Sequence, residues 1–181
     1  MSGSSSSSPS IKSYRGISGA STIEHNPDTS KYTIRFGGTA IETTVTDKST
    51  VVDQWVEDMN ALYATNSSIV VGIDIERCAI RNKSATLNLC IDKKCLVVQL
   101  FYIDNLPKLA LERYSHWWPS WADPPSLKDL ANDLVRLSMK KPKLVSLSNW
   151  GARVLSIEQV EYACVDAHVS YQIGHKLLRD D

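Results

Sequence analysis

The segment from Ile69 to Glu76 reads IVVGIDIE, and it decides how the rest of the chain is interpreted. Its β-branched residues predict a buried strand that ends in two acids. Side chains two apart on a strand share a face, so Asp74 and Glu76 point to the same side. Two carboxylates this close repel each other unless a cation joins them, and Mg²⁺ or Mn²⁺ accepts such hard oxygen ligands. The alternative is an exposed strand end with two solvated acids, because D-x-E is a short and common pattern.

The residues around this acidic strand predict further strands and a helix. Alternation over 32–36 and 41–45, broken by two glycines, predicts a hairpin. A helix capped by Ser49 or Thr50 follows, with apolar residues at helical spacing to about Ala64. After the acidic strand, two apolar runs flank the turn Asp92-Lys93-Lys94 and predict a three-stranded antiparallel meander.

The second half of the chain is helical in pattern. Ser126 caps a helix with leucines at helical spacing, which we expect to end before Pro142 because proline cannot continue a helix. Ser156 and Gln159 form a capping box that opens a last helix, running to about Leu178. Strands therefore come first and helices later, which predicts an α+β protein with a mixed sheet flanked by helices.

The last predicted helix carries a second polar pair. Tyr162 and Asp166 are four residues apart, so they lie on one helix face, among small and apolar neighbours that predict burial. A buried acid without a partner costs several kcal/mol, which a metal would offset. The alternative is an ordinary hydrogen bond between a tyrosine and an aspartate at a helix surface.

Together, Asp74-x-Glu76, Tyr162-x-x-x-Asp166 and the intervening Ser148-Asn149-Trp150 resemble the 3′-to-5′ exonuclease family with the DEDD motif, tyrosine subtype. Within that family the chain looks most like the plant proteins similar to the Werner syndrome exonuclease domain. The resemblance implies a ribonuclease H-like fold and hydrolysis of nucleotides from a nucleic acid 3′ end by two Mg²⁺ or Mn²⁺ ions. It also implies that Asp74 bridges both metals, that Glu76 and Asp166 each bind one, and that Tyr162 orients the attacking water.

One part of the family pattern is missing. The family's four-acid set needs a further aspartate from a middle motif, in which a buried strand is followed by a helix that begins with that residue. No acid between Asp104 and Asp166 follows a buried strand, and Asp104 and Asp123 are the candidates to replace it. Without a fourth acid, metal affinity and turnover should fall. The rival reading is therefore a catalytically impaired family member that binds nucleic acid or a protein.

The missing strand has a structural consequence as well. In the family it pairs with the edge of the strand that carries the two acids, so its loss would leave backbone groups open to water or to another chain. Self-association or a protein partner at this edge follows as a hypothesis.

Other residues could contact the nucleic acid. Arg77, directly after the acidic pair, and Lys83 are placed to contact the substrate backbone. Trp150 is a further candidate, and it is also assigned to the core. Lys140, Lys141 and Lys143 resemble a short nuclear import signal, but a solvated helix end is the simpler interpretation.

Composition narrows the class of protein. The 181 residues include 20 Lys+Arg and 20 Asp+Glu, so binding of nucleic acid would depend on a local patch rather than on bulk charge. No apolar run is long enough for a membrane span, and no secretory signal is evident, so we expect an intracellular protein, with the nucleus favoured. The four cysteines have no metal-site spacing and are predicted to be buried thiols. We expect residues 1–30 to form a disordered Ser-rich tail and residues 31–181 to form one exonuclease-like domain.

Overall fold

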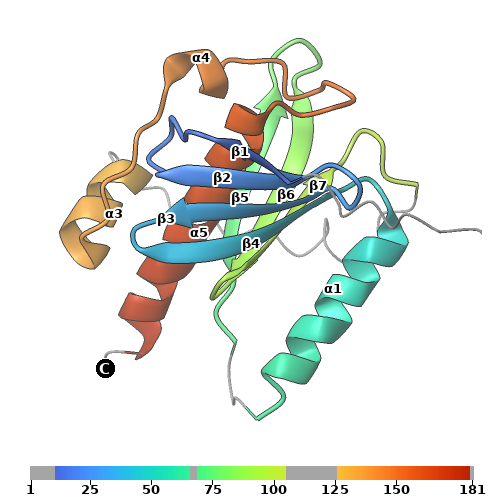
Figure 1. Cartoon of the computed structure of the whole chain (residues 1–181). Coiled ribbons are helices and arrows are strands. Elements are labelled where there is room, and N and C mark those ends of the chain that lie inside the picture. Colours follow the sequence, from blue (N-terminus) through green and yellow to red (C-terminus); the bar gives the residue numbers. More distant parts are fainter. Residues whose placement is uncertain (1–10, 66–68, 105–125, 180–181) are drawn as a thin grey trace, which may run out of the picture.

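The computed structural model describes residues 11–65, 69–104 and 126–179. Within these ranges the chain forms one seven-stranded mixed sheet with helices on both faces (Figure 1). The strands are β1 (Lys12–Tyr14), β2 (Thr22–Asn26), β3 (Lys31–Phe36), β4 (Thr39–Thr46), β5 (Gly72–Cys78), β6 (Lys83–Ile91) and β7 (Lys94–Gln99). The helices are α1 (Ser49–Leu62), α3 (Leu127–Val135), α4 (Lys143–Ser146) and α5 (Ile157–Arg179). The predicted α+β architecture is confirmed.

The strand order is β1-β2-β3-β4-β7-β6-β5, and the pairing of β4 with β7 is the parallel one among antiparallel neighbours. The predicted β3–β4 hairpin turns at Gly37 and Gly38, whose φ angles of 55° and 80° suit glycine. Strands β5, β6 and β7 form the predicted meander. The acidic strand β5 therefore lies at one end of the sheet, and β1 lies at the other.

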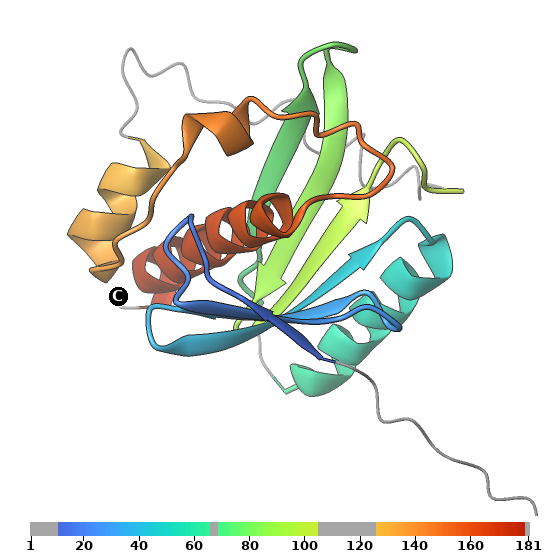
Figure 2. The same ribbon diagram turned by 45° about the horizontal axis from the view of Figure 1, so that its top comes forward.

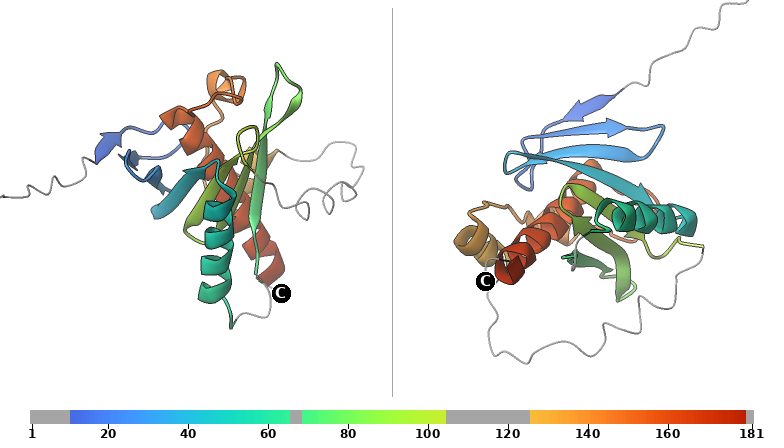
Figure 3. Two further views of the ribbon diagram at one scale, coloured as in Figure 1. Left: turned by 90° about the vertical axis from the view of Figure 1, so that its right-hand side faces the viewer. Right: turned by 90° about the horizontal axis from the view of Figure 1, so that it is seen from below.

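Helix α5 crosses one face of β5, β6 and β7, while α1 lies on the opposite face (Figures 2 and 3). The predicted capping box fixes the start of α5. The Gln159 backbone N–H donates to Ser156 Oγ, and the Ser156 backbone N–H donates to Gln159 Oε1. Helix α3 begins at the predicted cap Ser126 but ends earlier than expected, because Arg136 adopts a left-handed conformation. None of the helices in these ranges is long and apolar enough to cross a membrane.

The first residues of the described chain correct the predicted tail. Residues 11–30 contain β1 and β2, so the prediction that the disordered tail extends to residue 30 was wrong; residues 1–10 lie outside the described ranges. Ile23 is fully buried, and the backbone amides of Ile17, Ser18 and Ala20 donate hydrogen bonds to the Glu161 carboxylate on α5. This segment is short of apolar residues, so its order depends on these distant contacts, which its own sequence pattern does not reveal.

The acidic strand is less buried than its sequence predicts. Ile75, on the face opposite α5, is 49% exposed, and Val71 just before the strand is 40% exposed. In the described part of the chain β5 pairs with β6 alone, so its other edge has no strand beside it. A β-branched run is typical of a central strand, but the number of neighbours is set by the rest of the chain. The prediction of a buried strand was therefore wrong, whereas the predicted open edge is found in the described residues.

Candidate metal centre

Three carboxylates converge where α5 packs on β5. Asp74 and Glu76 come from β5 and Asp166 from α5, and one oxygen of each lies within 4.8 Å of the others. The close approach depends on Gly72, because a Cβ there would lie 2.1 Å from the Ala167 carbonyl oxygen. Asp74 and Glu76 share a face of their strand, as predicted, and that face is turned toward α5. The two sequence patterns, which lie far apart in the chain, thus form one site.

Tyr162 lies one helical turn before Asp166 and is 5% exposed. Its ring packs edge-on against Trp150, with the ring centroids 5.9 Å apart. Burial, followed by the charges of Asp166 and Glu76, raises the pKa of the Tyr162 hydroxyl well above its usual range. The phenol therefore stays protonated and can donate a hydrogen bond at the acid cluster.

Two neighbours contact the acids directly. Lys141, in the segment between α3 and α4, donates from Nζ to Asp166 Oδ2 at 2.7 Å. Asn88, fully buried on β6, donates from Nδ2 to Asp74 Oδ2 at 2.7 Å, and its own Oδ1 has no partner among the described residues. The interpretation of Lys141 as a solvated helix end was wrong. Asn88 was missed, although a polar residue within an apolar strand was a signal that could have indicated it.

The acids bind protons more strongly than ordinary carboxyl groups. Burial, together with the charges of Asp74 and Asp166, raises the pKa of Glu76 to about 8. Burial raises the pKa of Asp166 to about 6, although Lys141 opposes the shift, and it raises the pKa of Asp74 as well. A single ammonium does not balance three partly buried carboxylates. Their hard oxygens and unbalanced charge fit a divalent cation such as Mg²⁺ or Mn²⁺.

These pKa shifts predict that the metal-free protein loses stability as the pH rises. Because folding raises the pKa of Glu76 from about 4.5 to about 8, the folded state holds more protons than the unfolded state between these values, so the free energy of unfolding falls across this window. We expect Glu76→Gln to unfold at a higher temperature than the wild type at pH 8 in EDTA, and to show a flatter pH profile. Thermal unfolding at pH 5 and pH 8, followed by circular dichroism, measures this difference, and parallel profiles for the two proteins would contradict it.

Comparisons with known proteins give the site its context. A family model described as 3′-5′ exonuclease matches residues 109–180, which include Tyr162 and Asp166. A protein of Arabidopsis thaliana named 3′-5′ exonuclease is 25% identical over 190 residues, covering 81% of this chain. In these comparisons the chain is similar to 3′-5′ exonucleases. It spans 66% of the length of that exonuclease, slightly less than two thirds.

Solved structures of a further exonuclease are similar to this chain. The EXD2 exonuclease domain soaked in Mn is 20% identical, with 75% of this chain and 89% of that chain covered and a TM-score of 0.34. The same domain soaked in Mn and dGMP gives the same identity and TM-score, with 88% of that chain covered.

The fourth acid of the exonuclease pattern does not come from Asp104. Its carboxylate accepts a hydrogen bond of 3.0 Å from the Ser49 amide at the start of α1. The prediction that Ser49 or Thr50 caps α1 was wrong, because Lys48 is the N-cap residue and its side chain makes no capping hydrogen bond. The Asp104 carboxylate instead accepts from the Ser49 amide in the first turn of the helix. Asp123, the other candidate, lies outside the described residues. Within the described ranges the acid cluster has three members.

The sequence analysis also predicted residues for nucleic acid contact. Trp150 is 1% exposed and its Nε1 donates to the Ser146 carbonyl, so the assignment to nucleic acid was wrong and the assignment to the core is confirmed. Arg77 is exposed on the strand of the acids, where its Nη2 donates to Asn82 Oδ1 at 3.0 Å. Lys83 is exposed at the start of β6. Both cations remain available candidates.

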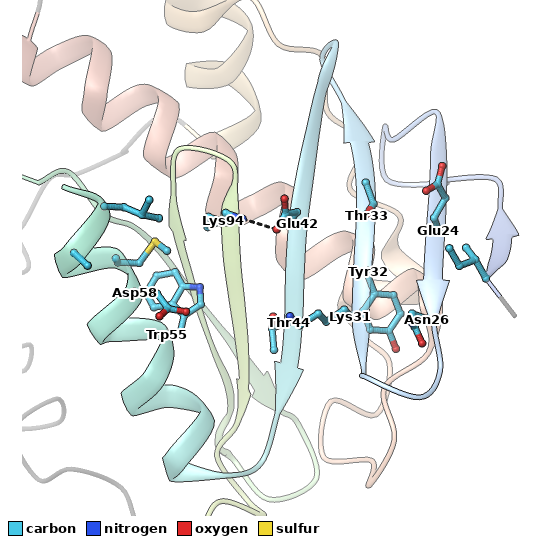
Figure 4. A pocket seen from close by; sticks show the side chains of 14 residues that line it. Glu24, Asn26, Lys31, Tyr32, Thr33, Glu42, Thr44, Trp55, Asp58 and Lys94 are labelled. Atoms are coloured by element: carbon cyan, nitrogen blue, oxygen red, sulfur yellow. Dashed lines mark hydrogen bonds and ion pairs between the residues drawn. The ribbon is translucent and has the colours of Figure 1, made fainter. Parts of the chain in front are cut away.

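A pocket in the described part of the chain lies away from the three acids. A groove of about 690 Å³ runs between α1 and the outer faces of β2, β3 and β4, opposite α5 (Figure 4). It contains an ion pair between Lys94 and Glu42, and Trp55 and Tyr32 contribute to its walls. None of the three clustered acids lines it. We assign the candidate site to the acid cluster, because chemistry depends on converging functional groups and not on volume.

The four cysteines, as predicted, are buried free thiols.

Proposed function

We propose that this chain is a metal-dependent 3′-to-5′ exonuclease of the DEDD type, tyrosine subtype, which removes nucleotides from the 3′ end of DNA or RNA. The convergence of Asp74, Glu76 and Asp166 beside the hydroxyl-bearing Tyr162 carries this proposal. The family match over the last helix and the Arabidopsis relative support it.

The proposed ligands are those that the family resemblance implies. Asp74 would bridge two divalent cations, while Glu76 and Asp166 would each hold one. When bound, Mg²⁺ or Mn²⁺ would supply the positive charge that makes water acidic and stabilises the leaving 3′ oxygen.

The other groups of the site would orient the attacking water, the Asp74 carboxylate and the phosphates of the substrate. Tyr162, held neutral by its environment, would orient the attacking water through its hydroxyl rather than remove a proton from it. Asn88 would keep the Asp74 carboxylate in one orientation through their 2.7 Å hydrogen bond. Arg77 and Lys83, both exposed near the β5–β6 hairpin, would contact backbone phosphates.

A second candidate function is favoured by the three-member acid cluster. An incomplete ligand set would leave a family member that binds nucleic acid without cutting it, or that pairs with another protein or a second copy through the open edge of β5. Size-exclusion chromatography over a range of concentrations tests the self-association, and a monomer throughout would count against it.

Degradation of an end-labelled nucleic acid separates these two functions. A duplex with a 3′ overhang, labelled at its 5′ end, is incubated with the wild-type chain and Mg²⁺, Mn²⁺ or EDTA, alongside the matching RNA. We expect a ladder of shortened products with a divalent cation and an intact substrate with EDTA. An intact substrate under all three conditions, with retarded migration in a native gel, would instead support the binding function. The expected nuclear location is a separate proposal, and imaging of a fluorescent fusion tests it.

A further inference from the structure

Lys141 is held at the acid cluster by anchored backbone on both sides. The preceding Met139 is 1% exposed, and the Lys140 amide donates to the Ser18 carbonyl at 2.9 Å. On the other side, Pro142 is the N-cap residue of the short helix α4, and Val145 in that helix is buried. Because both flanks are fixed, Lys141 has little freedom to leave the position that its backbone gives it.

Its ammonium group faces the acids rather than the solvent. Nζ lies 2.7 Å from Asp166 Oδ2 and 5.7 Å from the centroid of the Tyr162 ring, and about a third of the side chain is exposed. Among the described residues, Lys141 is the one cation that forms an ion pair with an acid of the cluster.

We propose that Lys141 is a built-in counter-ion whose ammonium competes with a divalent cation for the Asp166 carboxylate. This inference rests on the proposed function in so far as that function requires the cluster to bind metal. A divalent cation binds carboxylate oxygens at about 2.0 to 2.2 Å, and the ammonium already sits at hydrogen-bonding distance from one of the two oxygens of Asp166. Two cations on one carboxylate repel each other, so the ion pair opposes metal binding. The lysine thus lowers metal affinity and sets the metal concentration at which the site fills.

The surroundings of Lys141 favour a competing role. Its partner Asp166 is one of three acids with an oxygen of each within 4.8 Å of the others, so the ammonium lies beside the cluster at which a divalent cation would bind. The acids remain half-buried at positions 74 and 76, so they are open to an incoming ion while the ammonium covers Asp166.

Calorimetric titration of the full chain with Mn²⁺ tests the competition. Because a hydrogen bond to a charged group contributes about 1.5 to 3 kcal/mol, we expect Lys141→Met to bind Mn²⁺ about 10- to 100-fold more tightly than the wild type. Lys141→Arg keeps the charge and should bind Mn²⁺ no more tightly than the wild type. Lys140→Met removes the same charge from an exposed neighbouring side chain and serves as the matched control. Asp74→Ala in the Lys141→Met background should remove the tight binding, which locates it at the cluster.

Stability of the metal-free protein provides a second readout. In EDTA, Lys141→Met should unfold at a lower temperature than the wild type, and saturating Mn²⁺ should reverse the difference. If Lys141→Met does not fold, Lys141→Gln, which can still donate to Asp166, takes its place in both measurements. A lysine with a structural role alone would lower stability and leave Mn²⁺ affinity unchanged. Unchanged or weaker Mn²⁺ binding, or the absence of binding in both proteins, would overturn the proposal.

The outcome is separable from that of the proposed function. A Mn²⁺ affinity that increases in Lys141→Met, in a chain that degrades no nucleic acid, would refute the exonuclease function and support the competition. Degradation of nucleic acid with a Mn²⁺ affinity that is the same in both proteins would do the reverse.

Discussion

The Asp74→Ala variant is expected to lose metal-dependent trimming of 3′ ends by at least about a thousandfold. Asp74 is one of the three acids with an oxygen of each within 4.8 Å of the others, and the proposed function makes it a ligand of the divalent cations. A catalytic cation contributes several kcal/mol of charge stabilisation, and each 1.36 kcal/mol corresponds to a tenfold change in rate. Losing about 4 kcal/mol therefore lowers the rate about a thousandfold.

Two further variants separate chemistry from folding. Asp74→Asn keeps the size of the side chain and removes its charge, so we expect a loss of the same order. Asp58→Ala removes an exposed acid of α1 and should trim at the wild-type rate. The measurement is the initial rate of shortening of the end-labelled duplex with Mn²⁺, accompanied by circular dichroism of each variant. Trimming by Asp74→Ala at the wild-type rate would show that the cluster is not the catalytic centre.

The Glu161→Ala variant is expected to lose about 3 to 5 kcal/mol of the free energy of unfolding. The Glu161 side chain is fully buried, with Oε1 accepting from the Ser18 and Ala20 amides at 2.6 and 3.1 Å and Oε2 accepting from the Ile17 amide at 2.8 Å. Alanine would leave these amides without an acceptor, and those of Ser18 and Ala20 are buried. Each buried donor without a partner costs about 1 to 3 kcal/mol, and the three share one cavity, so their costs are not fully additive.

Urea unfolding followed by circular dichroism measures this loss, and a fall in melting temperature of about 2 to 4 °C per kcal/mol accompanies it. Glu158→Ala, an exposed acid in the first turn of the same helix, is the matched control and should change stability by less than about 1 kcal/mol. Equal stability of the two variants would mean that the N-terminal segment is not held by Glu161.

The hydrogen bonds of Glu161 could not be predicted from the residues around it in the sequence. It stands beside Tyr162 on the same helix, and its sequence environment gives no sign that its partners lie more than 140 residues earlier. Residues 11–30 have no pattern of their own that predicts strands, so they were assigned to a tail. Their order comes from pairing with β3 and from a buried carboxylate, and both of these are long-range contacts.

In the candidate metal centre, too, some features follow from local sequence patterns and others from the packing of distant segments. The shared face of Asp74 and Glu76 follows from the two-residue period of a strand, and the shared face of Tyr162 and Asp166 follows from the helical turn. The distance between the two pairs depends on how α5 packs against Gly72, which neither pattern contains. Lys141 was taken for a solvated residue because lysines near the end of a helix usually are, and its ion pair appears once the segment after α3 folds back.

Local sequence patterns predicted most of the elements and the chemistry that they carry: a hairpin with a glycine turn, a strand with D-x-E, a capping box, and a helix with Y-x-x-x-D. These features depend on residues a few positions apart, whose geometry the backbone fixes. Three features appear only in the folded chain: the three acids lie within 4.8 Å of one another, Lys141 pairs with Asp166, and β5 ends the sheet in the described residues. Burial, charge pairing and strand neighbours join segments that are far apart in the sequence, so they are set when the chain packs.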